Sequence, residues 1–165
     1  KLNLLISKLK DASECGHKAL VFSQWTSMLD LMEPELVKAG VSFSRLDGAT
    51  RNRQDIVKNF QETDEASVLI MSLKAGGVGI NLTAADQVYI MDPWWNPAAE
   101  DQAADRTHRI GQDKPVMVYR LVAKNTIEEK ILELQEAKRH LSQSVITTGK
   151  GSKVISKNEL LSLFS

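Results

Sequence analysis

The sequence lacks several features that would place it in a specialised class of protein. Its 165 residues include one cysteine, Cys15, so no disulfide can form within the chain and a reducing intracellular compartment is expected. No apolar run approaches the roughly 18 residues that a membrane-spanning helix needs, so no membrane partner is expected. One cysteine and three scattered histidines do not have the spacing of a zinc site. We therefore expect no metal ligands.

Excess charge and a phosphate-binding loop are also missing. Lys plus Arg equals Asp plus Glu at 21 each, so any surface for nucleic acid must be local. The stretch Gly149-Lys150-Gly151-Ser152 lacks the earlier glycine and the preceding strand of a Walker A loop. The stretch Gly77-Val78-Gly79 lacks the third glycine of a dinucleotide fingerprint, which argues against a Rossmann oxidoreductase. No acidic box that would hold magnesium beside a nucleotide is present.

What the sequence does contain is an alternation of amphipathic and continuously apolar segments. Helical spacing of apolar residues predicts helices over residues 1–14, Trp25–Ala39 and Arg51–Gln61, with a kink or short break at Pro34. Apolar runs predict strands at Lys18–Ser23, Val41–Leu46, Ser67–Ser72, Gln87–Met91 and Val116–Val122. This order is typical of an α/β domain with parallel pairing, and the length suits one domain.

A glycine-rich segment follows the strand Ser67–Ser72. Gly76, Gly77 and Gly79 allow close approach of the backbone to a ligand, and successive N–H groups can form an anion-binding nest. Ligands of open α/β sheets bind at the carboxyl ends of the strands, where this segment lies. The alternative interpretation is a plain tight connection.

The most specific stretch covers residues 92–112. Pro97 suits the first position of a helix over Pro97–Ile110, and Gly111 is a natural stop. Gln102, Arg106 and Arg109 then share one helix face, which suits an anion. The alternative is a solvated face that is salt-bridged by the neighbouring acidic residues.

The sequence pattern of the carboxyl-terminal part predicts two further helices. Thr126 and Glu129 have the spacing of a capping box at the start of a long helix with apolar residues on one face. A last short helix is expected over Asn158–Phe164. We expect this part, residues 123–165, to pack on the outside of the domain as a brace.

Four segments resemble the second-lobe motifs of the Swi/Snf-type ATPases, a branch of the superfamily 2 helicases. Lys-Ala-Leu-Val-Phe-Ser-Gln-Trp at 18–25 is similar to motif IV, and Leu-Asp-Gly-Ala-Thr at 46–50 to the next family block. Residues 72–82 resemble motif V and residues 101–112 resemble motif VI. The resemblance implies a three-layer RecA-like second lobe with a mainly parallel central sheet over residues 1–122. The P-loop and the magnesium-binding acidic pair would belong to a first lobe that this chain lacks.

The resemblance also implies roles for individual residues. Arg106 and Arg109 would be arginine fingers that reach the phosphates of ATP across the cleft between the lobes, and Gln102 and Gly79 would border the nucleotide. ATP and Mg²⁺ would be held mainly by the first lobe. The implied DNA contacts are Ser23, Gln24, Ser72, Lys74, Gly76, Gly77, Asn81 and Trp95.

The implied partners are double-stranded DNA and the first lobe of the same chain, with DNA-bound proteins as a further class. Because residue 1 is a lysine, we expect a piece of a longer protein. The resemblance implies that this piece does not hydrolyse ATP by itself, because it would hold only half of the ATP site. Two alternatives stay open: an inert RecA-like module that binds DNA or a protein, and an RNA helicase lobe. The absence of long insertions favours a compact prokaryotic parent in the cytoplasm, whereas a eukaryotic parent would act in the nucleus.

Overall fold

A parallel sheet forms the centre of the molecule. The computed structural model describes residues 1–76, 80, 82–93 and 115–136. Within these residues five strands pair side by side in the order β2-β3-β1-β4-β5, and every pairing is parallel. The strands are β1 (Ala19–Ser23), β2 (Phe43–Leu46), β3 (Val68–Ser72), β4 (Gln87–Ile90) and β5 (Met117–Arg120). The five predicted strands and their parallel pairing are confirmed.

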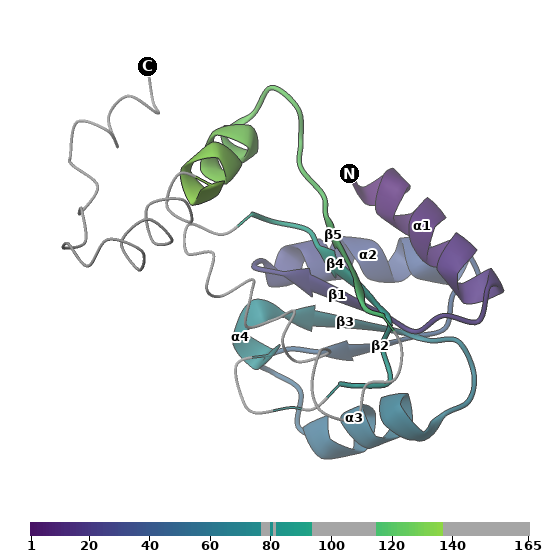
Figure 1. The fold of residues 1–165 in the computed structure, drawn as a ribbon. Coiled ribbons are helices and arrows are strands. Elements are labelled where there is room, and N and C mark those ends of the chain that lie inside the picture. Colours follow the sequence, from purple (N-terminus) through teal and green to yellow (C-terminus); the bar gives the residue numbers. More distant parts are fainter. Residues whose placement is uncertain (77–79, 81, 94–114, 137–165) are drawn as a thin grey trace, which may run out of the picture.

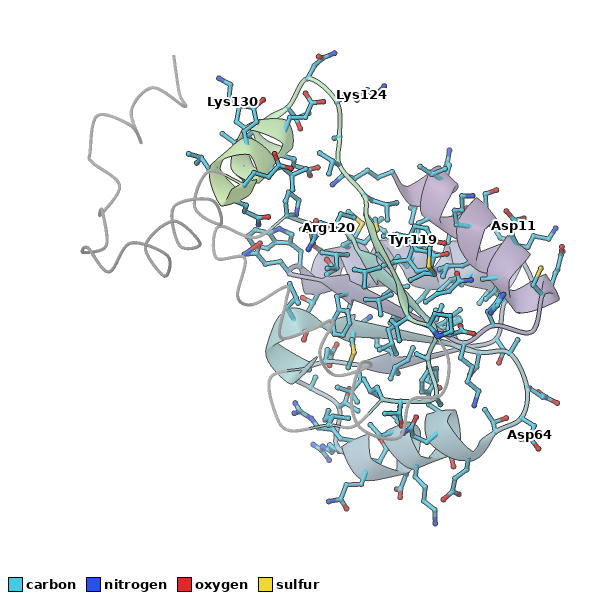
Figure 2. The ribbon with its side chains drawn as sticks, viewed as in Figure 1. Asp11, Asp64, Tyr119, Arg120, Lys124 and Lys130 are labelled. Atoms are coloured by element: carbon cyan, nitrogen blue, oxygen red, sulfur yellow. The ribbon has the colours of Figure 1, made fainter. Side chains whose placement is uncertain are left out.

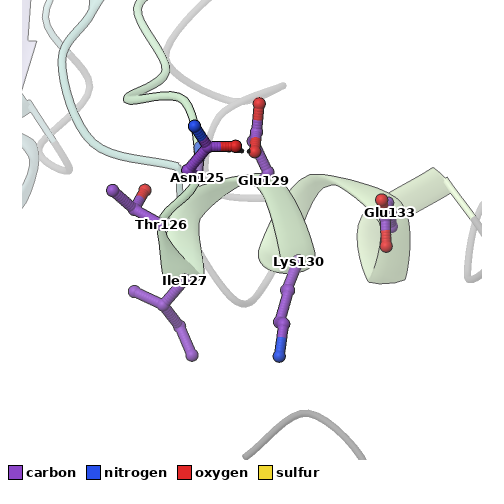
Figure 3. Close-up of a pocket in the computed structure, with 6 residues that line it drawn as sticks. All are labelled: Asn125, Thr126, Ile127, Glu129, Lys130 and Glu133. Carbon is purple, nitrogen blue, oxygen red and sulfur yellow. Dashed lines mark hydrogen bonds between the residues drawn. The ribbon is translucent and has the colours of Figure 1, made fainter.

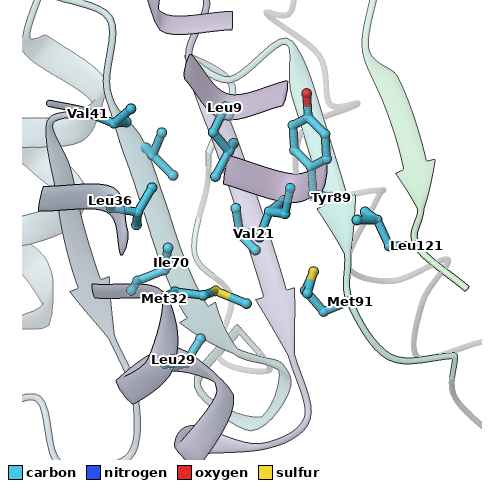
Figure 4. Close-up of a cluster of buried hydrophobic side chains, with 13 residues drawn as sticks. Leu9, Val21, Leu29, Met32, Leu36, Val41, Ile70, Tyr89, Met91 and Leu121 are labelled. Carbon is cyan, nitrogen blue, oxygen red and sulfur yellow. The ribbon is translucent and has the colours of Figure 1, made fainter. Parts of the chain in front are cut away.

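Helices cover both faces of the sheet, which gives three layers (Figure 1). On one face lie α1 (Leu2–Glu14) and α2 (Thr26–Lys38), and on the other lies α3 (Arg53–Glu62). Side chains of a strand alternate between the two faces, so each central strand serves two cores. Val21 and Ile70 pack with α1 and α2 (Figure 4), whereas Phe22 packs with α3. The predicted three-layer α/β architecture is confirmed.

Both helices of the first face end in the same glycine motif. Gly16 follows α1 and Gly40 follows α2, with φ of 79° and 69°. The next amide then turns back: His17 N donates to Ala12 O at 2.9 Å, and Val41 N donates to Leu36 O at 3.0 Å. This is the Schellman pattern, which only glycine enters without strain. It explains why β2 begins at Phe43 rather than at the predicted Val41.

Helix α2 continues through Pro34, so the predicted break does not occur. A proline inside a helix removes one backbone hydrogen bond and costs about 3 kcal/mol. Here Met32 and Leu36 flank Pro34 and are fully buried against the sheet, as is Leu29 one turn earlier. Burying each of such side chains contributes about 1.5–3 kcal/mol, so packing outweighs the lost bond.

β5 is one of the two edge strands of the sheet and carries Tyr119 and Arg120 (Figure 2). The Tyr119 ring stacks on Tyr89 of β4 with 4.9 Å between the ring centroids. Burial, together with the charges of Tyr119, Asp11 and Asp86, raises the pKa of Tyr89 to about 12, so this phenol stays protonated at neutral pH. Tyr89 therefore joins the edge strand to the core as a neutral ring.

Residues 127–136 are helical and begin the predicted long helix. Ile131 and Gln135 are buried, and the Glu128 carboxylate pairs with the Lys1 ammonium, which also donates to Met91 O at 2.7 Å. These contacts attach the helix to the start of α1 and to the end of β4. The rest of the predicted brace, including the helix over Asn158–Phe164, lies outside the described residues. No helix of the described residues is long and apolar enough to cross a membrane.

Candidate functional site

The carboxyl ends of β1, β3 and β4 meet at one edge of the sheet. The three strands are parallel neighbours, and Ser23 at the end of β1 is in register with Ser72 at the end of β3. Phe22 is in register with Ile90, so the chain leaves β4 at the same level and reaches Asp92 two residues later. Because this edge is where open α/β sheets bind ligands, we take it as the candidate site.

Asp92 connects the ends of two of these strands. Its Oδ2 accepts hydrogen bonds from Ser23 Oγ at 2.7 Å and from Gln24 N at 2.9 Å. Ser23 Oγ in turn accepts from Trp25 N at 3.1 Å. We call this group of four residues the Asp92 clamp. It fixes the backbone of the β1–α2 connection while the Trp25 side chain stays 60% exposed.

Ser72 begins a short helix at the same edge. Its hydroxyl accepts from Ala75 N at 3.2 Å, and residues Leu73–Gly76 form α4. The first part of the predicted glycine loop is therefore a capped helical turn, which includes Lys74 and Gly76 in its backbone. The serine favours this because its side chain replaces a missing backbone partner at the start of a helix.

Two predicted DNA contacts use their hydroxyls inside the domain. Ser23 is fully buried in the Asp92 clamp, and Ser72 is 5% exposed. Gln24 is half-buried, and its backbone N–H donates to the Asp92 carboxylate. The structure brings these three residues to one edge, and their contact with DNA stays a prediction. The other predicted site residues lie outside the described part of the chain: Gly77, Gly79, Asn81, Trp95, Gln102, Arg106 and Arg109.

The Leu-Asp-Gly-Ala-Thr turn at the end of β2 is also held by charged groups. Arg45 donates to Asp47 Oδ2 at 2.8 Å and pairs with Asp30 and Glu33 of α2 at 2.7 and 2.9 Å. Asp47 Oδ1 accepts from Ala49 N at 2.9 Å, and Arg53 donates to Asp47 O at 2.9 Å. The turn is thereby tied to α2 and to α3.

The same contacts change the ionisation of Asp47. Burial opposes its charged form, but the Ala49 amide and the Arg45 guanidinium favour that form more strongly. The pKa of Asp47 is therefore below its usual value. A carboxylate with a lowered pKa stabilises the fold above its unfolded pKa of about 3.9, and this contribution is lost as the pH falls through the lower folded value.

Asp47→Asn is accordingly expected to lower the free energy of unfolding at neutral pH by about 1–3 kcal/mol, because the Arg45 guanidinium loses one of its three charged partners. The difference from wild type should shrink as the pH falls through the folded pKa of Asp47. Urea unfolding at a series of pH values measures this. Asp64→Asn is the matched control, because Asp64 is exposed (Figure 2) and should keep the wild-type stability at neutral pH. A constant difference at all pH values would contradict the assignment.

An open depression of about 520 Å³ lies along the helix over residues 127–136 (Figure 3). Its lining holds two carboxylates and one ammonium on that helix, and comprises Asn125, Thr126, Ile127, Glu129, Lys130 and Glu133. Thr126 caps the helix as predicted, because its Oγ1 accepts from Glu128 N at 3.3 Å. The reciprocal bond differs by one residue, because Glu129 Oε2 accepts from Asn125 N at 2.7 Å rather than from Thr126 N. Asn125 adopts the left-handed region, with a φ of 57°. These contacts give the lining a role in starting the helix.

Sequence reasoning missed Asp92 and Arg45 as organising residues. A usable signal for Asp92 was present: an acidic residue follows a buried strand, and a neighbouring parallel strand ends in a serine.

Among the described residues no group of three or more His, Cys, Asp or Glu side chains is arranged to hold a metal ion. Two described carboxylates follow strands at this edge: Asp92 is bound in the clamp and Asp47 is bound by Arg45, so both already have partners within the domain.

Comparisons with known proteins identify the family of this fold. Residues 1–111 match the helicase conserved C-terminal domain family. The DNA repair protein RAD5B of Arabidopsis thaliana is 49% identical over 144 residues, which are 86% of this chain and 11% of that protein. The human chromatin-remodeling ATPase INO80 is 45% identical over 150 residues, which are 90% of this chain and 9% of that protein.

A solved structure agrees with these matches. The crystal structure of the C-terminal part of the Fun30 ATPase domain superposes with a TM-score of 0.76 at 42% identity, covering 81% of this chain and 44% of that chain. The chain spans about a tenth of the length of the two curated relatives. The matches and the parallel three-layer sheet agree with the four motifs, and the chain belongs to the helicase conserved C-terminal domain family as a RecA-like C-terminal lobe of the Swi/Snf type.

Proposed function

We propose that this chain is the second motor lobe of an enzyme that couples ATP hydrolysis to movement along double-stranded DNA. The observation that carries the proposal is that the end of motif IV, the start of motif V and the start of the residue 92–112 stretch lie at one sheet edge. These segments follow β1, β3 and β4, which are parallel neighbours. One edge can therefore serve both the nucleotide and the DNA.

Arg106 and Arg109 are proposed to contact the phosphates of ATP from this lobe. Negative charge spreads over the γ-phosphoryl oxygens during hydrolysis, and a guanidinium presents a planar fork of donors that stabilises it. Gln102 and Gly79 are proposed to border the nucleotide. Because the two described carboxylates that follow strands at this edge, Asp47 and Asp92, are already hydrogen-bonded within the lobe, we place the Mg²⁺ ligands and the P-loop on the first lobe.

The DNA track is proposed to follow the loops after β1 and β3. Polar side chains and backbone amides of such loops bind phosphates, which fix position and carry no sequence information. The formal net charge is zero, so attraction to DNA depends on local donors rather than on the field of the whole domain. The proposed contacts are those predicted from the sequence: Ser23, Gln24, Ser72, Lys74, Gly76, Gly77, Asn81 and Trp95.

The proposed partners are the first lobe of the same chain, duplex DNA and proteins bound to it. The two curated relatives come from a plant and from human, and the name of one of them refers to chromatin. These relatives give no support to a prokaryotic parent. We therefore propose a nuclear location.

The proposal is tested by measuring ATP hydrolysis of the complete parent protein with duplex DNA, with single-stranded RNA and without nucleic acid. We expect stimulation by duplex DNA, no strand separation, and no hydrolysis by the 165-residue chain alone. Stimulation by RNA together with strand separation would favour an RNA helicase. A parent protein that binds DNA and never hydrolyses ATP would identify an inert module.

A further inference from the structure

The Asp92 clamp joins two segments with different proposed tasks. Ser23, the last residue of β1, and Gln24, in the loop that follows, are both proposed to contact DNA. Asp92 lies directly before the segment that carries Trp95, Gln102 and the two proposed arginine fingers. Asp92 Oδ2 accepts hydrogen bonds from Ser23 Oγ and from Gln24 N, which are 69 and 68 positions away in the sequence. The clamp is thus a direct link between the two segments.

The geometry gives each group of the clamp a defined hydrogen-bonding direction. Ser23 Oγ has one proton and lies 2.7 Å from the Asp92 carboxylate and 3.2 Å from Trp25 O. The shorter bond to a charged acceptor is the stronger one, so the proton points to Asp92. The lone pairs of Ser23 Oγ are then free to accept from Trp25 N at 3.1 Å. A displacement of residues 24–25 therefore changes the contacts of Asp92.

Burial makes this link stiff. Ser23 is fully buried, as is Met91 beside Asp92, and Met91 N donates to Phe22 O at 2.9 Å. Asp92 itself is half-buried, but the Ser23 end of the bond is shielded from water, and a buried hydroxyl keeps its partner because leaving it unpaired is costly. The loop and the end of β4 are expected to move together.

We propose that Asp92 is a positioning residue that couples the β1–α2 loop to the segment beginning after Pro93, so that DNA held by the loop promotes ATP hydrolysis. This inference rests on the proposed function, because it assigns the loop to DNA and the following segment to ATP. Asp92 touches neither ligand. It acts through Ser23 and Gln24.

The test uses the complete parent protein with the variants Ser23→Ala, Asp92→Ala and both together, because alanine at 92 removes the oxygen that accepts both bonds. The readout is the ratio of ATP hydrolysis with saturating duplex DNA to hydrolysis without DNA. Partial unfolding lowers both rates by the same factor, so the ratio reports coupling rather than folding. Ser67→Ala is the matched control, because the Ser67 hydroxyl is buried at the opposite end of β3 and has no hydrogen-bond partner among the described residues.

We expect each single variant to lower the ratio about tenfold, and the double variant to lower it no further, because both changes break the same link. Ser67→Ala should keep the wild-type ratio. Wild-type ratios in Ser23→Ala and Asp92→Ala, alongside a wild-type enzyme that DNA stimulates, would overturn the coupling and leave the proposed function standing. A wild-type enzyme that duplex DNA does not stimulate would overturn both.

Discussion

Arg106→Ala or Arg109→Ala in the complete parent protein is expected to reduce DNA-stimulated ATP hydrolysis by about a hundredfold or more, which corresponds to roughly 2.7 kcal/mol of barrier. An arginine that stabilises the charge of a transferring phosphoryl group contributes about 10³ to 10⁵ in rate. The charge develops mainly in the transition state, so kcat should fall more than the affinity for ATP. Steady-state kinetics with saturating duplex DNA measure the change.

Two controls distinguish this role from a structural one. Arg106→Lys keeps the charge and removes the planar fork, so it should also be impaired if the fork binds the phosphates. Lys8→Ala removes an exposed cation of α1 and should leave hydrolysis unchanged. Binding to duplex DNA, measured for the alanine variants by fluorescence anisotropy, should persist. If both alanine variants hydrolyse ATP like wild type, the predicted helix is structural or binds another anion, and the proposal that this lobe is part of a motor is wrong.

The sheet could be predicted because its signals are local. Each central strand is a short apolar run, and both faces of the sheet are covered, so the run needs no polar alternation. β3 is buried along its whole length. The glycines at 16 and 40 mark helix ends because a left-handed residue there is nearly specific to glycine. Such signals need only a few neighbouring residues.

The contacts that organise the candidate site could not be predicted in this way. Asp92 meets Ser23 across 69 positions, and His17 meets Asp86 at 2.8 Å across the same separation. Arg45 reaches Asp30 across 15 positions. Such pairs form only after strand order is fixed, and the strand order β2-β3-β1-β4-β5 differs from the order in sequence. Composition and periodicity therefore indicate which residues are polar at the edge and do not indicate their partners.

The continuous helix α2 shows a second limit of local reasoning. Propensity alone predicts an interruption at Pro34, because a proline removes a hydrogen bond. Tertiary packing decides the outcome, because Met32 and Leu36 are buried on the same side of the helix. At the start of the segment after β3, for which an anion-binding nest is predicted, a side-chain cap likewise decides the local structure. Ser72 caps α4 and draws residues 73–76 into a helical turn.

Leu5→Ala is expected to lower the free energy of unfolding of the chain by about 2–5 kcal/mol, because it removes a buried side chain and leaves a cavity. Leu5 is fully buried in the cluster that α1 and α2 form with the sheet. A change of this size is a large fraction of the stability of an ordinary domain, which is about 5–15 kcal/mol. Chemical denaturation followed by circular dichroism measures it.

Leu4→Ala provides the matched control, because the two leucines are neighbours on α1 and differ in burial. Leu4 is 58% exposed, so its truncation should change the stability by no more than about 0.5 kcal/mol. Both substitutions replace leucine by alanine in the same helix, so helix propensity cancels from the comparison. Equal effects would show that α1 is not packed on the sheet as described. A large difference would establish that α1 is packed on the core of the lobe. Contact with the core, rather than the helix propensity of its own residues, would then be the reason that α1 is helical.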